Sequence, residues 1–192
     1  MSVRRSATAL AVLLLLVLAT PPLAAQTVID FESVAACDNS RPNMGVFEGV
    51  DFLNQWTCYD FAQPPFTPSS GTNRIYAVDG TANAASAFFE FLGGPATFNG
   101  AFLAGSTSVM FNMFLDGGLV ATSSSLLTSD TPTFLSSGYA GAVDRVEVVG
   151  SSVEWILDDL SYTVPEPATL ILLGTGLLGL GGVSAVRRRR EV

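Results

Sequence analysis

The sequence predicts an all-β protein, an antiparallel β-sandwich, on three observations. Short runs rich in Val, Ile, Phe and other strand-favouring residues recur along the middle of the chain and are separated by turn residues. Gly, Ser and Thr are abundant throughout, and no segment before the C-terminal tail has a helical period. No linker is long enough to divide the middle of the chain, so one sandwich domain is expected.

Each predicted strand is a short apolar or alternating run that ends at a polar or glycine-containing turn. Pro64-Pro65 makes the segment from Cys58 to Gly71 a long loop, because proline is not accommodated at the centre of a strand. Asp116-Gly117-Gly118 is a hairpin signal. In order along the chain, the predicted strands are 27–32, 45–56, 74–78, 87–92, 96–103, 108–115, 119–123, 133–136, 143–149 and 153–164.

The N-terminus is predicted to be a signal peptide, residues 1–25. Arg4 and Arg5 precede a short apolar run, and the small residues of Leu23-Ala24-Ala25 suit cleavage before Gln26. The alternative is a retained N-terminal anchor. With a signal peptide, the exported β-sandwich would span residues 26–163.

The C-terminal tail, residues 164–192, has three parts. The tripeptide Pro165, Glu166 and Pro167 comes first, residues 168–186 carry no charge, and Arg187, Arg188, Arg189 and Arg190 close the segment. Nineteen helical residues span roughly 28 Å, about the thickness of a bilayer core. The five glycines weaken insertion, so we expect a marginal transmembrane helix with a basic stop that stays on the cytoplasmic side.

This three-part tail resembles the PEP-CTERM sorting signal of exported Gram-negative proteins. The resemblance implies that Pro165, Glu166 and Pro167 are recognised by a membrane-embedded exosortase and are not part of the protein's own chemistry. It also implies an intermediate held in the inner membrane and then delivery to the cell surface or extracellular matrix. The alternative is an ordinary anchor in which the tripeptide is a rigid spacer.

Charge excludes one class of partner. Residues 26–163 contain three arginines and 15 acidic residues, a formal net charge of −12, and the whole chain has no Lys and no His. Nucleic-acid binding requires a basic face and is therefore excluded. An acidic surface favours solubility and the binding of divalent cations.

Cys37 and Cys58 are the only cysteines. In an exported domain, two cysteines favour one disulfide, which would close a loop of about 21 residues and stabilise the fold by roughly 3 kcal/mol. Two buried free thiols are the alternative.

The order of the later strands, including Phe98 to Leu103 and Trp155 to Tyr162, resembles jelly-roll ectodomains that are similar in outline to carbohydrate-binding modules. This loose resemblance covers the second half of the domain and implies a jelly-roll-like sandwich. Such modules often carry a structural Ca²⁺, which is the only cofactor that the sequence suggests.

Carboxylates on the first and last strands are the candidate Ca²⁺ ligands. Asp30 and Glu32 are expected to share one face of the first strand, and Asp158 and Asp159 to point to opposite faces of the last. These two strands are often neighbours in sandwiches, so Glu32 with Asp158 or Asp159 could hold the ion. Alternatively, these residues cap strand ends or face water.

Trp56 and Tyr59 flank the proline-rich loop and are candidate sugar-stacking residues, although a role in the core is equally compatible with the sequence. Catalysis is not expected, because a chain without histidine offers no Ser-His-Asp, Cys-His or zinc arrangement. The resemblance of the tail implies a non-enzymatic surface or matrix role among extracellular polysaccharides. The alternatives are a Ca²⁺-assisted carbohydrate-binding module and a small glycosidase.

Overall fold

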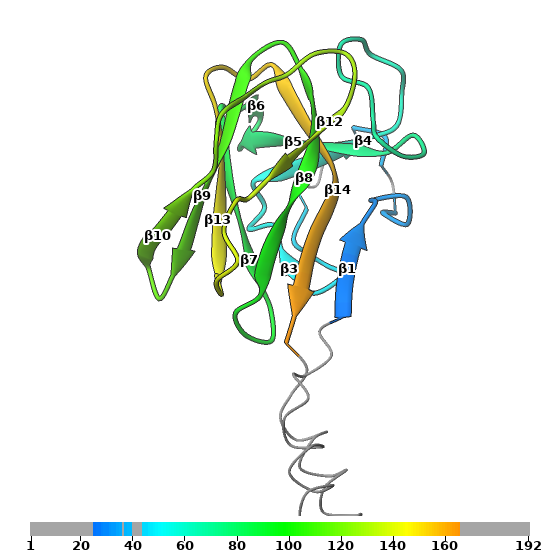
Figure 1. Cartoon of the computed structure of the whole chain (residues 1–192). Helices are drawn as coiled ribbons and strands as arrows, with labels where there is room; N and C mark the ends of the chain where they lie inside the picture. Colours follow the sequence, from blue (N-terminus) through cyan, green and yellow to red (C-terminus); the bar gives the residue numbers. More distant parts are fainter. Residues whose placement is uncertain (1–24, 36, 40–43, 166–192) are drawn as a thin grey trace, which may run out of the picture. The chain divides into compact units, whose positions relative to one another are not determined.

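Two β-sheets face each other in the computed structural model, which describes residues 25–35, 37–39 and 44–165 (Figure 1). One compact unit spans Gln26–Val164. The predicted membrane span and basic stop, and all but the last residue of the predicted signal peptide, lie outside the described residues. Among those described, no helix is long and apolar enough to cross a membrane.

The first sheet, sheet A, has the first and last strands of the domain side by side. Its order is β12-β8-β14-β5-β4, with β1 also paired to β14 and β6 to β5. The bounds are β1 Ala25–Ile29, β4 Trp56–Tyr59, β5 Arg74–Asp79, β6 Ala82–Asn83, β8 Thr97–Gly105, β12 Thr133–Ser136 and β14 Trp155–Val164. The expected adjacency of first and last strands is confirmed.

The second sheet, sheet B, has the order β10-β9-β13-β7-β3-β2, with β11 also paired to β9. Its pairings are antiparallel. The bounds are β2 Val46–Phe47, β3 Val50–Asp51, β7 Ser86–Phe91, β9 Ser108–Leu115, β10 Gly118–Thr122, β11 Leu126–Leu127 and β13 Arg145–Gly150. The predicted antiparallel β-sandwich is thus confirmed.

Aromatic side chains fill the space between the sheets. Trp56 of sheet A meets Trp155 edge to face at 5.6 Å between ring centroids, and it lies 6.4 Å from Phe89 of sheet B. Phe89 in turn contacts Phe98 of β8 at 5.6 Å. Each buried large side chain stabilises the fold by about 1.5–3 kcal/mol, so this cluster contributes much of the driving force for sheet packing.

The hairpin predicted at Asp116-Gly117-Gly118 is present between β9 and β10. Leu115 pairs with Gly118, which leaves Asp116 and Gly117 as a two-residue loop. Both have positive φ, 50° and 77°. Those angles define the tight turn that matches strand twist, and Asp-Gly tolerates them best.

The prediction of one strand over 45–56 is wrong. The segment forms the short hairpin β2–β3 on sheet B and then crosses to sheet A, where β4 begins at Trp56. Leu53 and Asn54, both at φ 55°, reverse the chain at the crossing. β3 and β4 both place apolar residues in the same core. The apolar pattern therefore runs on through the corner and does not show where one strand ends and the next begins.

The first strand is also shorter than the predicted 27–32. β1 ends at Ile29, and Phe31 has a φ of 60°, which is incompatible with an extended strand. Phe31 is nevertheless fully buried. The turn at Phe31 places this ring in the core. Because β1 has already ended, Asp30 and Glu32 lie beyond the strand and do not share one of its faces.

β14 carries a bulge at Asp159, whose φ is 45°. The register with β8 shifts between Asp158 and Ser161, and Leu157 and Leu160 both point into the core. The extra residue interrupts the two-residue alternation. Asp158 and Asp159 consequently contact the same loop, and the prediction that they point to opposite faces is wrong.

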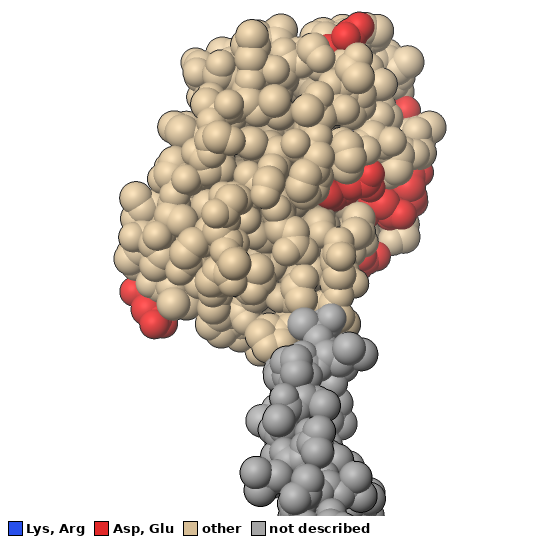
Figure 2. Space-filling model, in the orientation of Figure 1, with Lys and Arg blue, Asp and Glu red and all other residues tan. Residues whose placement is uncertain are grey.

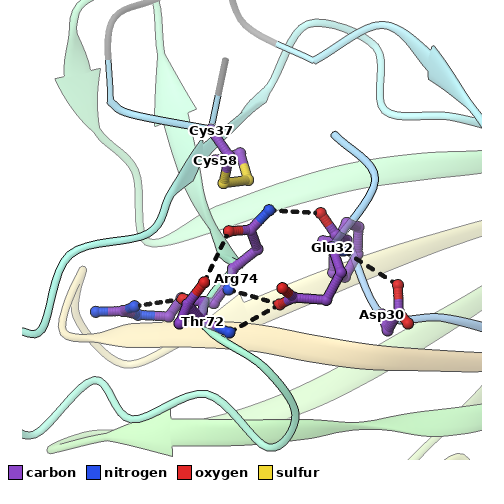
Figure 3. Close-up of a disulfide and its surroundings, with 8 residues drawn as sticks. Asp30, Glu32, Cys37, Cys58, Thr72 and Arg74 are labelled. Carbon is purple, nitrogen blue, oxygen red and sulfur yellow. Dashed lines mark hydrogen bonds between the residues drawn. A yellow bond between two sulfur atoms is a disulfide. The ribbon is translucent and has the colours of Figure 1, made fainter. Parts of the chain in front are cut away.

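The disulfide between Cys37 and Cys58 is present and ties the loop after β1 to β4 (Figure 3). Both cysteines are buried. The backbone nitrogen of Asn39 donates to the carbonyl of Cys58, so the covalent link is reinforced by a backbone hydrogen bond.

Candidate functional site

A groove of about 700 Å³ lies on the outer face of sheet A, over β8, β12, β14 and β1. We call it the sheet A groove. Its volume is within the ~300–1,000 Å³ that is usual for small-molecule sites. Among its lining residues are three aromatic and four polar ones: Phe102, Phe134, Tyr139, Gln26, Asn99, Asp159 and Ser161.

The aromatic side of the sheet A groove comes from β8, β12 and the loop after β12. Phe134 pairs across the strands with Phe102, and their rings meet edge to face at 5.3 Å between centroids. Phe134 is 41% exposed, so part of its ring is available to a ligand. Tyr139 lies close to the backbone at Gly141, where an added Cβ would come within 2.3 Å of its hydroxyl oxygen.

The polar floor is a small network of amides and hydroxyls. The Ser161 hydroxyl oxygen accepts from Gln26 Nε2 at 3.0 Å and from Asn99 Nδ2 at 3.2 Å, and Asn99 Nδ2 also donates to Thr163 Oγ1 at 3.1 Å. Both amides donate through nitrogen. In the described part of the chain, the side-chain oxygens of Gln26 and Asn99 accept no hydrogen bond, and both residues line the groove.

The loop between β4 and β5 is fastened to sheet A beside the groove. Asp158 Oδ2 accepts from the backbone nitrogens of Ser69 and Ser70 at 2.7 and 2.9 Å. The Ser70 hydroxyl donates to Asp159 Oδ1 at 2.8 Å. Adjacent carboxylates at the β14 bulge therefore hold one point of a long loop.

Asp158 has no solvent exposure. Burial, the largest effect, raises its pKa from 3.8 to about 7, and the neighbouring charge of Asp159 adds to the rise. Hydrogen bonds from the backbone of Ser70, Asp159 and Ser69 lower the pKa but do not offset burial.

Glu32 holds the same loop from the other side (Figure 3). Its Oε1 accepts from the backbone nitrogens of Thr72 and Asn73 at 2.9 and 2.7 Å. Arg74, which follows, is buried and donates to the backbone oxygens of Thr72 and Phe61. The Arg74 side chain thus ties the loop to itself, and the Glu32 side chain ties it to the segment after β1.

The predicted Ca²⁺ ligands Glu32, Asp158 and Asp159 all contact the segment 69–73. One carboxylate oxygen of each accepts hydrogen bonds from this loop and is therefore already used. In the described ranges, no group of three or more His, Cys, Asp or Glu side chains is arranged to hold a metal. Asp30 accepts from the backbone nitrogen of Glu32 and caps the turn after β1. Ca²⁺ binding stays a prediction.

Trp56 cannot stack on a sugar in this structure, and that hypothesis is corrected. Its ring is fully buried among Phe52, Phe89 and Trp155, and its Nε1 donates to the Phe88 carbonyl at 2.8 Å. This is the core role that the sequence left open.

Tyr59 is only 3% exposed, and the Arg74 guanidinium lies 4.0 Å from its ring centroid. It lines a smaller pocket of about 240 Å³ together with Phe61 and Tyr76. Burial raises the Tyr59 pKa. Tyr59 thus lines the second pocket, and Arg74 covers one face of its ring.

Sequence reasoning missed the residues of the sheet A groove. Phe134 lies in a short strand with only a weak signal, and Phe102 lies in the run Ala101-Phe102-Leu103, where consecutive residues are apolar and no outward face is marked. Their proximity depends on the β12–β8 register, which pairs them directly. A phenylalanine that faces outward on each of two strands could have indicated a binding surface. That prediction also requires the order of the strands in the sheet, which the sequence does not show.

Acidic side chains gather on one side of the molecule, where β1 ends, and the face drawn in Figure 2 has no basic side chain in its described part. Of the two arginines that the structure describes, Arg74 is buried and Arg145 lies 3.5 Å from Glu90. Neither lines the sheet A groove.

Among solved structures, several carbohydrate-binding modules of family 29 are similar in fold to this chain. One mutant module is 14% identical with a TM-score of 0.42, and the match covers 73% of this chain and 93% of the module. A second mutant is 13% identical with a TM-score of 0.44, and the match covers 73% of this chain and 92% of the other. A third, complexed with cellulohexaose, is 13% identical with a TM-score of 0.42, and the match covers 73% and 91%. Values this low do not identify a ligand for the present chain.

No curated protein sequence matches the chain. A family model does match its tail: residues 163–190 fit the PEP-CTERM protein-sorting motif. The chain therefore carries a PEP-CTERM sorting signal after a β-sandwich domain. The motif indicates an exported protein that an exosortase sorts, as the tail's resemblance implied.

Proposed function

We propose that this protein is delivered to the cell surface or extracellular matrix of a Gram-negative bacterium, where its β-sandwich has a non-enzymatic role among exopolysaccharides. The match of residues 163–190 to the sorting motif is the observation that carries the proposal. The tail serves as an address: the inner membrane holds the chain briefly, and the exosortase then processes it near Pro165 to Pro167.

The composition of the chain supports a non-enzymatic role. It has no histidine, so the common general base and zinc ligand is missing. The paired carboxylates Asp158 and Asp159 are occupied in holding the 69–73 segment. What the domain offers instead is a groove with aromatic and amide side chains, which suits binding.

The intact mass of the mature protein tests the sorting proposal, measured in its own host with and without the exosortase. We expect a product that begins near Gln26 and lacks the residues after the Pro-Glu-Pro tripeptide in the wild-type strain only. A product that keeps Arg187 to Arg190 in the membranes of both strains would identify a plain anchor and defeat the proposal.

A Ca²⁺-assisted carbohydrate-binding module is the second candidate. It is favoured by the contacts that Glu32, Asp158 and Asp159 all make with the segment 69–73, where a cation would have to replace the hydrogen bonds that these carboxylates accept from the loop. Melting temperatures in excess Ca²⁺ and in EDTA test it. Binding predicts a rise of several degrees with Ca²⁺ and not with Mg²⁺, while identical melting curves would argue against the site.

A further inference from the structure

We infer that the sheet A groove binds an uncharged polysaccharide, with Phe134 as the stacking residue and the amides of Gln26 and Asn99 as the hydroxyl acceptors. This inference rests on the proposed role among exopolysaccharides and adds the site and the ligand class. Three properties of the groove carry it.

The first property is the mixed character of the walls. Phe134 exposes part of its ring beside Phe102, and the amides of Asn99 and Gln26 lie on the floor. A pyranose ring has an apolar C–H face that fits an aromatic ring, and a rim of hydroxyls that fits amide oxygens. An aliphatic chain would leave these polar groups without partners, at a cost in affinity.

The second property is the polarity of the floor. Asn99 Nδ2 donates to both Ser161 and Thr163, and Gln26 Nε2 donates to Ser161, while the side-chain oxygens of both amides have no donor in the described part of the chain. Acceptors of this kind bind ligands that donate, as hydroxyl groups do. Asp159, whose Oδ1 already accepts from Ser70, adds a further acceptor at the same edge.

The third property is charge. Of the described residues that line the groove, Asp159 is the single charged one, and none is an arginine that could neutralise an acidic ligand. The surrounding domain is also strongly acidic. Polyuronates and sulfated polymers would be repelled, while one carboxylate is too few for a metal. An uncharged polymer remains.

The test is binding of the mature protein, purified from its host, to a soluble β-glucan, a soluble galactomannan and polygalacturonate, measured by affinity electrophoresis and calorimetry. We expect binding to at least one neutral polymer and at least tenfold weaker binding to polygalacturonate. Phe134→Ala should weaken neutral-polymer binding at least tenfold, and Phe134→Trp should restore it.

Two matched variants locate the effect. Leu127→Ala removes a comparable apolar side chain that is 75% exposed on sheet B, and Phe61→Ala removes a phenylalanine that is 46% exposed at the second pocket. Both should bind as the wild type does. Thermal melting of every variant checks that the fold is intact.

The outcomes separate the inference from the proposed function. Wild-type binding that survives Phe134→Ala but is lost in Phe61→Ala would move the site to the second pocket and overturn the inference, while the exopolysaccharide role would stand. Preferential binding of polygalacturonate would overturn the ligand class. Wild-type protein that binds none of the polymers would defeat both the inference and the polysaccharide role.

Discussion

Asp158 is the residue whose surroundings differ most from those of an ordinary carboxylate. It is fully buried on a central strand, yet three backbone nitrogens, from Ser69, Ser70 and Asp159, donate to it. Its role is to hold a loop against a sheet. The same burial makes this contact sensitive to protonation.

We predict that Asp158 makes the domain less stable as pH rises through 7. The folded pKa of about 7 lies above the ordinary 3.8, so between these values the folded state binds the proton more tightly than the unfolded state. The contribution is therefore fully present below about pH 4 and is lost as pH rises through about 7. Urea unfolding from pH 4 to 8 measures it.

Asp158→Asn is the control for that experiment, because an amide keeps an acceptor oxygen for Ser69 and Ser70 and does not titrate. Other acidic groups also repel one another as pH rises, so the informative quantity is the difference in slope between wild type and variant. Parallel stability curves would show that Asp158 does not titrate in this range.

At the scale of elements, two strands can come so close together that only glycine fits at the point of contact. Gly105, at the end of β8, has a φ of 143°, and a Cβ there would lie 2.2 Å from the Glu154 carbonyl oxygen. Gly93 also has positive φ, 88°, but an added Cβ would meet nothing within 4 Å. An alanine at Gly93 would therefore introduce backbone strain alone, whereas an alanine at Gly105 would introduce both backbone strain and a steric clash.

We expect Gly105→Ala to destabilise the domain by about 3 kcal/mol or more, since the β8–β14 pairing must move. Gly93→Ala should cost only about 1–2 kcal/mol, the strain of left-handed backbone. Denaturant midpoints of the two variants measure this. Equal losses would mean that the strands adjust freely at Gly105.

The disulfide is the other constraint at this scale. Replacing Cys37 and Cys58 together by alanine should cost about 3 kcal/mol, because the closed loop of 21 residues restricts the unfolded chain. The free energy of unfolding of the double variant should then equal that of the reduced wild type. A reduced wild type as stable as the oxidised protein would show that the bond contributes nothing.

At the scale of the whole molecule, the sandwich class and most strands could be predicted because alternation survives wherever one face of a strand is buried. The hairpin at Asp116 could be predicted because its residues allow few other turns. The corner at Leu53 and Asn54 and the bulge at Asp159 could not, since each depends on which sheet the chain joins next.

The candidate site was less accessible to sequence reasoning than the fold. The carboxylates at 158 and 159 were placed near Glu32 because the first and last strands adjoin, and they do contact one loop. The sequence leaves Trp56 open between a stacking role and a core role, because a buried and an exposed tryptophan look alike in a sequence. Phe134 was passed over because a four-residue strand has little pattern of its own.

The bulge in β14 also determines where the chain can change length. Leu157 and Leu160 face the core with two residues between them, where a regular strand has one. Deleting Asp159 would restore strict alternation and keep Leu160 and Tyr162 inward, whereas deleting Leu157 would put later side chains out of phase. A central strand thus contains a position at which a one-residue deletion should leave the fold intact, and that deletion would remove the one charged side chain among the described residues that line the groove.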